Sequence, residues 1–222
     1  MSKIIGITGL AQDPKGNRSI LGAGKDSVAD ILVDSFGYVR VSLADEMKRT
    51  ARRWYPAFTE EHLWGPSEKR SELVEVAPNV FLTARHVLQQ LGTEVGRCIW
   101  QDTWIYITLN TTKALLNDPD LDYSPIWGLI KIPRIGGSKG CAGVVIPDMR
   151  VPNEYTAILE AGGKNVRVFR PVPEVKTTET QHTSEQGVLF YPDDSFSYVI
   201  QNTGSLDDLR DAVAGMLNGW LQ

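Results

Sequence analysis

The sequence predicts an α/β fold built on a parallel β-sheet. A short apolar run at Ile4–Thr8 leads into a glycine-rich turn at 22–27. A helix-like run follows at 28–36, and a second apolar run lies at Tyr38–Val41. Strand, loop, helix and strand in this order make a βαβ unit, whose strands lie parallel in one sheet. Because the first strand is almost continuously apolar, we expect helices on both faces of the sheet.

Composition excludes several classes of protein. The chain has 222 residues, 42% hydrophobic and 23% charged, which suits one sizeable domain with mobile subdomains. The net charge of −4 argues against binding a nucleic-acid polymer, although local arginines can still bind a small anion. Cys98 and Cys141 lie far apart and favour a reducing compartment. Without a signal peptide or an apolar run near ~20 residues, we expect a cytoplasmic protein that does not enter a membrane.

The string Gly22-Ala23-Gly24-Lys25-Asp26-Ser27 opens the first helix and has the features of a phosphate-binding loop. Glycines let backbone N–H groups approach phosphate oxygens, and the helix N-terminus adds partial positive charge. Lys25 would reach the β- and γ-phosphates of a nucleotide, and Ser27 would bind Mg²⁺. The alternative is an ordinary glycine-rich turn.

The spacing of this loop departs from the usual G-x-x-x-x-G-K-[ST]. Asp26 separates Lys25 from Ser27, and the glycine that should open the loop is Gly9. Residues 12–21 therefore read as an insertion within the loop. The insertion would either project outward from the site or fold over the donor site through Lys15 and Arg18, and we expect the outward projection.

The segment after the first βαβ unit is rich in arginine and in short helices. Residues 44–54 form a basic helix whose charges we expect to be mostly solvated. Thr59 caps a short helix that ends near His62, and a turn follows at 65–67. This segment is a candidate substrate-binding flap.

The longest helical pattern runs from Phe81 to Trp100, with Thr83 as its N-cap. Gly92 inside this helix suggests close packing or a nearby ligand. Another helix is expected at 103–116. Residues 117–143 are irregular apart from a short strand at 128–132.

The remaining strands end in residues that suit a ligand site. A buried strand at 144–150 ends in Asp148-x-Arg150, where open α/β sheets bind ligands. A helix at 152–159 and a strand at 166–170 follow. Residues 171–187 contain almost no apolar side chains and read as a linker or a closing lid. A last strand at 197–201 precedes a helix that Ser205 caps.

Taken together, these segments resemble bacteriophage-type deoxynucleoside monophosphate kinases, a branch of the P-loop nucleoside monophosphate kinases. The matching strings are GAGKDS at 22–27, ADEMKR at 44–49, LWGPSEKR at 63–70, LGTEVGR at 91–97, DMRVPNE at 148–154, HTSE at 182–185 and NTGSL at 202–206. The resemblance implies a three-layer P-loop fold with an inserted helical flap for the nucleoside monophosphate, at about 44–80, and a mobile lid, at about 171–195. The core would comprise residues 1–43, 81–170 and 196–222.

The resemblance also implies ATP as phosphoryl donor, Mg²⁺ as cofactor and a nucleoside monophosphate as acceptor. The loop would hold the donor phosphates through Gly22, Ala23, Gly24, Lys25, Asp26 and Ser27. Asp148 would share Mg²⁺ with Ser27. Arg70, Arg85 and Arg150 would clamp the acceptor phosphate, since guanidinium groups suit phosphate oxygens. Arg170 would swing onto the transferred phosphoryl group when the lid closes.

Other assignments stay open at the level of sequence. Gln89 or Gln90 would read the acceptor base, and Glu94 is either the partner of an arginine or a contact to the sugar. Arg85 is otherwise a solvated charge, and Asp148 with Arg150 a structural ion pair. The alternative functions are a kinase for another phosphorylated acceptor, such as dephospho-coenzyme A, and a non-catalytic nucleotide-binding protein. The resemblance allows a homodimer through the helix at 81–100.

Overall fold

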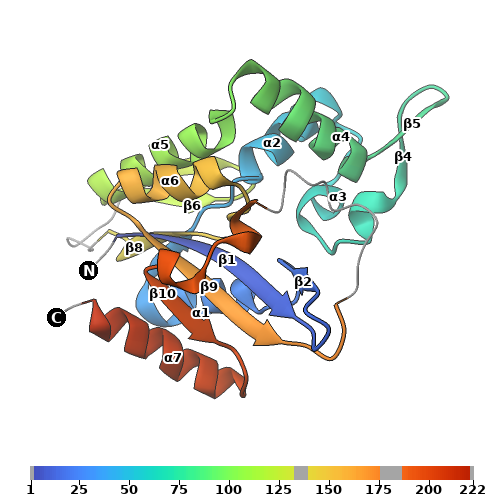
Figure 1. Cartoon of the computed structure of the whole chain (residues 1–222). Helices are drawn as coiled ribbons and strands as arrows, with labels where there is room; N and C mark the ends of the chain where they lie inside the picture. Colours follow the sequence, from blue (N-terminus) through green and yellow to red (C-terminus); the bar gives the residue numbers. More distant parts are fainter. Residues whose placement is uncertain (1–2, 133–139, 176–186, 221–222) are drawn as a thin grey trace.

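The computed structural model describes residues 3–132, 140–175 and 187–220, and its centre is a parallel sheet (Figure 1). The parallel strands are β1 (Ile4–Gln12), β3 (Tyr38–Arg40), β8 (Gly143–Ile146), β9 (Lys164–Pro171) and β10 (Tyr198–Gln201). Their order is β10-β9-β1-β8-β3, with every neighbouring pair parallel. The predicted α/β fold around a parallel sheet is confirmed.

Helices cover both faces of this sheet, as the apolar strands require. On one face α1 (Lys25–Phe36) and α7 (Leu206–Gly219) pack on Ile5 and Ile7 of β1. On the other face α5 (Thr103–Asn117) and α6 (Pro152–Glu160) pack on Ile4 and the strand β8. In Figure 1, α5 and α6 lie above the sheet and α7 below it. Within the described residues, no helix combines the length and apolar character that crossing a membrane requires.

The insertion at 12–21 is a continuation of β1 as a hairpin. β1 was expected to end at Thr8, but it runs to Gln12 because β9 pairs with it as far as Pro171. The chain turns back after Asp13, and β2 (Arg18–Ser19) pairs with Ala11 and Gln12. Residues 14–18 are exposed, which agrees with the expected outward projection.

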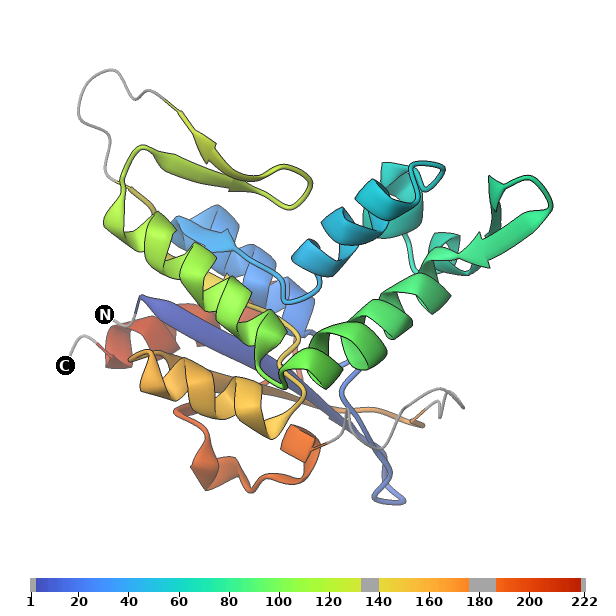
Figure 2. The ribbon, with the colours of Figure 1, turned by 90° about the horizontal axis from the view of Figure 1, so that it is seen from above.

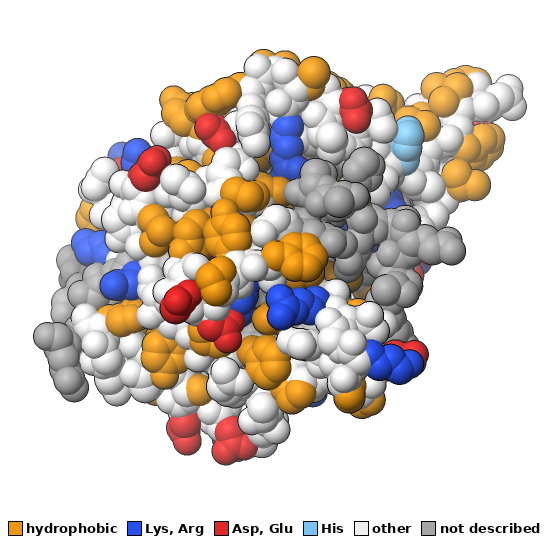
Figure 3. Space-filling view, in the orientation of Figure 1, with side chains coloured by type: hydrophobic (Ala, Val, Ile, Leu, Met, Phe, Trp, Pro, Cys, Tyr) orange, Lys and Arg blue, Asp and Glu red, His pale blue; other side chains and the backbone are white. Residues whose placement is uncertain are grey.

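A separate small core organises residues 45–90, which extend beyond the predicted flap of about 44–80 and are called the flap from here on. It is built from α2 (Asp45–Trp54), α3 (Glu60–Trp64), η1 (Lys69–Ser71), β4 (Leu73–Ala77), β5 (Val80–Thr83) and α4 (Ala84–Gln90). Its buried centre consists of Ala51, Phe58, Leu63, Ala84, Val87 and Leu91. The flap extends from one side of the sheet (Figure 2). Its β4–β5 hairpin carries exposed apolar side chains, seen at the right in Figure 3.

The helix predicted at 81–100 differs from the observed structure in two ways. It begins only at Ala84, because Val80–Thr83 pairs with β4 in a hairpin that the sequence did not reveal. Thr83 is the N-cap, as predicted. From Leu91 to Arg97 the chain forms η2, a π-helix rather than an α-helix. Such wide turns are rare and often lie at functional sites.

Trp104 of α5 packs on the π-helix and explains Gly96. Its indole N–H donates to the Gly92 carbonyl over 3.0 Å. A Cβ at Gly96 would lie 2.3 Å from the Trp104 ring, so only glycine lets the ring pack there. Close packing at this turn, suspected from Gly92, is therefore present.

The start of the flap is tied to a second hairpin, β6 (Leu121–Ser124) with β7 (Gly128–Lys131). β7 was predicted, and β6 was not. Arg49 was expected to be solvated, but it is 9% exposed and donates to the Pro125 carbonyl over 2.8 Å. The expectation is wrong for Arg49 because this hairpin, distant in sequence, covers it.

Residues 187–195, the last part of the predicted lid, pack on the core through Arg167. This buried guanidinium donates to the Val188 and Tyr191 carbonyls and pairs with Asp193 over 2.8 Å. The residues form η4 (Gly187–Phe190) and η5 (Asp193–Ser195). His182, Ser184 and Glu185 lie outside the described residues, as does most of the glycine-rich run at 136–140.

The packing of Trp104 generates a test of the π-helix. Gly96→Ala should lower the free energy of unfolding by about 1–3 kcal/mol, because the Trp104 ring must shift to admit the methyl group. The matched control is Gly215→Ala in α7, where an added Cβ meets no atom within 4 Å. That control should be neutral or stabilising by up to about 1 kcal/mol. Urea unfolding measures both, and equal effects would contradict the packing described.

Candidate active site

The glycine loop between β1 and α1 has a backbone that suits close approach of an anion. Gly22 and Gly24 have φ values of 80° and 94°, which favour glycine. Asn202, after β10, donates its amide to the Ala23 carbonyl over 2.8 Å. A Cβ at Gly24 would lie 2.3 Å from this amide nitrogen. Asn202 therefore fixes the loop, a role that its sequence position alone did not suggest.

Lys25 begins α1 and lies between two carboxylates. Its side chain is 9% exposed, and Nζ lies 2.8 Å from Asp26 Oδ2 and 3.4 Å from Asp148 Oδ1. Asp26 also pairs with Arg40 of β3. Burial raises the pKa of Asp26, but hydrogen bonds and charges from Lys25 and Arg40 outweigh this and lower it. A buried amine in this position carries the charge that a phosphate group requires.

Asp148 follows β8 in a strained backbone conformation. Its φ of 70° is unusual for a residue other than glycine and costs on the order of 1 kcal/mol. Oδ2 accepts from Arg150 Nη2 over 2.6 Å. Oδ1 is buried and receives no hydrogen bond from the described residues. Strain of this kind is typical of functional sites.

Asp148 is compatible with Mg²⁺. Its Oδ1 accepts no hydrogen bond from the described residues and lies 3.4 Å from Lys25 Nζ. Mg²⁺ is usually held by one or two protein oxygens together with phosphates and waters, and Asp148 would supply one of them. Ser27, in the first turn of α1, lines a hollow with Leu206 and Arg210 of α7, so its predicted contact with the ion stays a prediction.

Lys48, Arg70 and Arg85 of the flap influence one another in a chain. Burial lowers the pKa of Arg70, and the charge of Arg85 lowers it further. Burial also lowers the pKa of Lys48; Arg70 and Arg40 add to the effect, and Asp45 and Asp148 oppose it. Like charges disfavour one another, and an anion bound between them would offset this. Lys48 lies in the matching string at 44–49, but the sequence alone gives neither Lys48 nor Arg40 a role.

Arg70 and Arg85 are held in place by the turn at 65–71. Arg70 Nη1 donates to the Gly65 carbonyl over 3.2 Å. Arg85 Nε donates to Ser71 Oγ, and its Nη2 to Ser67 Oγ, each over 3.0 Å. Arg85 is thus not a freely solvated charge, although part of its hydrogen-bonding capacity serves the turn.

A buried carboxylate lies behind Asp148 and Arg150. Glu154, 4% exposed, accepts from the Arg150 backbone N–H over 2.8 Å and pairs with Arg97 over 3.3 Å. Burial raises the pKa of Glu154, and the Arg150 N–H and the Arg97 charge counter it. Glu94 had been considered as an arginine's partner; it is exposed, and the arginine of the π-helix pairs with Glu154 instead.

Arg170 is not brought into contact with this cluster. It is exposed near the end of β9 and lies opposite Ala11, on the extension of the sheet. Its side chain has no hydrogen-bond or ion-pair partner among the described residues. Contact of Arg170 with the transferred phosphoryl group would require this side chain to move toward the site, and this role stays a prediction.

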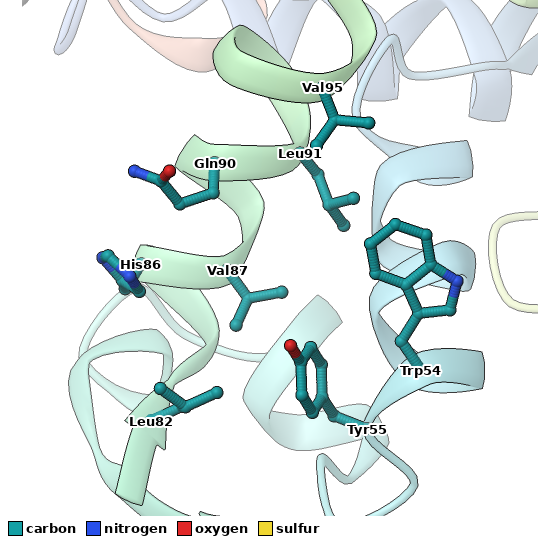
Figure 4. A pocket seen from close by; sticks show the side chains of 8 residues that line it. All are labelled: Trp54, Tyr55, Leu82, His86, Val87, Gln90, Leu91 and Val95. Atoms are coloured by element: carbon teal, nitrogen blue, oxygen red, sulfur yellow. The ribbon is translucent and has the colours of Figure 1, made fainter.

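An apolar pocket of about 170 Å³ lies between α2 and α4 (Figure 4). Its lining consists of Trp54, Tyr55, Leu82, His86, Val87, Gln90, Leu91 and Val95. Gln90 belongs to this lining, although Figure 4 shows its amide on the side of α4 away from Trp54. Gln89 shares the helix face of Arg85, four residues earlier. Of the two glutamines, Gln89 is therefore the one on the cationic side of α4.

Comparisons with known proteins give one relative in sequence. No protein-family model matches the chain. A protein of Acanthamoeba polyphaga mimivirus named "Putative deoxynucleotide monophosphate kinase" is 27% identical over 155 residues, which is 68% of this chain and 70% of the relative.

Two solved structures share features of the fold. Shikimate kinase from Aquifex aeolicus has a TM-score of 0.44 at 10% identity, covering 98% of both chains. Dephospho-CoA kinase from Campylobacter jejuni has a TM-score of 0.34 at 13% identity, covering 98% of this chain and 96% of that one.

Because Lys48 carries a partly desolvated charge that Arg70 and Arg40 disfavour, removing this charge should stabilise the ligand-free protein. Lys48→Met keeps the apolar stem but removes a desolvated charge beside Arg70 and Arg40, so the Tm of the ligand-free protein should rise by about 2 °C. With pyrophosphate present the order should reverse, because the wild-type protein binds the anion better. Lys113→Met, an exposed lysine of α5, should change neither value. Thermal scans with and without pyrophosphate measure this. A lower Tm of the ligand-free variant would mean that Lys48 is already satisfied.

Proposed function

We propose that the protein is a kinase that transfers the γ-phosphoryl group of ATP to a nucleoside monophosphate, with deoxynucleotides as the expected acceptors. The observation that carries the proposal is the position of Lys25, beside a glycine loop and 3.4 Å from Asp148, whose charge also acts on Lys48 of the flap. The name of the mimiviral relative supports the same activity.

Donor binding is assigned to the loop and Lys25. The N–H groups at the start of α1 and the partial charge of that helix favour the phosphates of ATP. Lys25 would exchange its contacts with Asp26 and Asp148 for phosphate oxygens. Asp26 would remain paired with Arg40. Bound Mg²⁺, held by Ser27 and Asp148, would neutralise charge on the donor phosphates.

Acceptor binding is assigned to cations from both sides of the site. Arg70, Arg85 and Lys48 would hold the acceptor phosphate from the flap, and Arg150 would hold it from the core. Phosphoryl transfer passes through a loose transition state that needs positioning and charge neutralisation rather than covalent catalysis. Cations contributed by the flap and by the core would position the acceptor phosphate and neutralise its charge. Gln89, on the face of Arg85, is the candidate for contact with the base, and Glu94 for contact with the sugar.

The lid has a proposed role in excluding water. Water in the open site competes with the acceptor and would hydrolyse ATP. Arg170 stands at one end of the polar segment 171–187. Closure of this segment would bring its guanidinium toward the transferred phosphoryl group.

A kinase for another phosphorylated acceptor, such as dephospho-coenzyme A, is the competing function. The flap cations would bind any phosphate monoester, so they do not separate the two acceptors. A protein that only binds nucleotides would use Lys25 and Asp148 as well, so acceptor-dependent turnover is what separates it from a kinase.

The test is release of ADP with a panel of acceptors. The panel contains deoxy- and ribonucleoside monophosphates, dephospho-coenzyme A and buffer alone. We expect ADP release to depend on a nucleoside monophosphate. Turnover with dephospho-coenzyme A only would identify the competing function, and no dependence on any nucleotide would contradict the proposal.

Variants of the donor residues test the mechanism. Lys25→Met should lower kcat by about 10³-fold and Asp148→Asn by about 10²-fold, because each removes a charge that is needed most in the transition state. Lys164→Met is the matched control, since Lys164 lies at the opposite end of β9 and rests over the Trp220 ring. Its kcat should stay within two-fold of wild type. Full activity of folded Lys25→Met would refute the assignment.

A further inference from the structure

The loop that carries Asp148 and Arg150 is held by a carboxylate that touches neither side chain in the described contacts. Glu154 Oε2 accepts from the backbone N–H of Arg150 over 2.8 Å and from that of Val151 over 3.2 Å. These bonds fix the chain immediately after Asp148, whose φ is 70°. Such a conformation persists only where surrounding contacts enforce it. Glu154 supplies two of those contacts.

The second oxygen of Glu154 reaches another part of the fold. Oε1 lies 3.3 Å from Arg97 Nη2, at the last residue of the π-helix η2. The π-helix directly continues α4, which carries Arg85 and Gln89. Glu154 therefore joins the Asp148 loop of the core to the helix that bears residues of the flap.

An ordinary role of Glu154 as the third residue of α6 explains only part of this. A glutamate at that position often accepts from backbone N–H groups at the helix start. A glutamate side chain is rarely buried unless it is paired, and Glu154 is only 4% exposed. A buried carboxylate needs a charged partner, and that partner comes from 57 residues away in sequence.

We infer that Glu154 and Arg97 form a positioning pair, which holds the Asp148–Arg150 loop in a fixed position relative to the flap. Neither residue touches a substrate in this account. The expected effect of the pair on the reaction rate rests on the proposed phosphoryl transfer. The expected effect of the pair on the position of the loop rests on geometry alone. When the pair is broken, the loop loses its orientation although its own residues are unchanged.

Hydrogen exchange tests the geometric part without any need for activity. In full-length Arg97→Met, exchange of the Arg150 and Val151 amides should rise at least about ten-fold, although Arg97 touches neither amide. Glu154→Gln, which can still accept from both amides but loses the charge, should act in the same direction. Arg97→Lys, which keeps the charge, should lie closer to wild type. Faster exchange confined to residues 91–100 in Arg97→Met would overturn the inference.

Kinetics test the functional part. Both Glu154→Gln and Arg97→Met should lower kcat at least about ten-fold, with the KM for ATP within two-fold, because the glycine loop is untouched. The double variant should be no slower than the slower single one, since the two residues act as a unit. Additive losses, or an unchanged kcat despite faster exchange, would overturn it.

A control separates positioning from general destabilisation of α6. Asn165 is buried and donates to the Tyr155 carbonyl of the same helix over 2.8 Å. Asn165→Ala should lower the Tm while leaving exchange at Arg150 and Val151 unchanged. If the wild-type protein shows no turnover, the proposed function fails, and exchange still decides whether the pair holds the loop.

Discussion

The ion pair between Lys25 and Asp148 depends on the pairing of two parallel strands. β1 leads to the glycine loop and Lys25, and β8 leads to Asp148. The register Ile4↔Val144 to Gly6↔Ile146 keeps the two strands side by side. Because neighbouring parallel strands end at the same edge of the sheet, the loops that follow them meet there. The remaining parts of the candidate site are arranged around this meeting point.

The flap is anchored to the core at both of its ends. At its start, Asp45 accepts from the Tyr123 hydroxyl over 2.9 Å. At its end, Trp104 donates to Gly92, and Arg97 pairs with Glu154. These contacts limit how far the flap cations can move relative to Asp148. In the proposed function, these contacts make the acceptor site largely preformed.

Local signals in the sequence predicted much of the fold, and distant contacts account for what they missed. Gly37, Thr59 and Ser205 end or cap helices as expected, because capping depends on neighbouring backbone groups. The π-helix depends on Trp104, which no periodicity reveals. The burial of Arg49 depends on a hairpin some 75 residues away, as its bond to Pro125 shows.

In the candidate site, too, local sequence signals predicted some residues, and contacts distant in sequence account for those that were missed. The glycine loop, Asp148 and Arg150 were predictable because each follows an apolar strand. Lys48 and Glu154 were not, since a charged residue on a helix is usually solvated, and only tertiary packing buries Glu154 and half-buries Lys48. The partner of Arg97 could not be inferred for the same reason.

The central claim is that the glycine loop and the flap cations form one site for two phosphorylated substrates. Calorimetric titration with adenosine joined through five phosphates to a deoxynucleoside tests it most directly. One molecule that fills both halves should bind at least about 10²-fold more tightly than ATP or the monophosphate alone, because the second contact becomes intramolecular. An affinity no greater than that of ATP would contradict the claim.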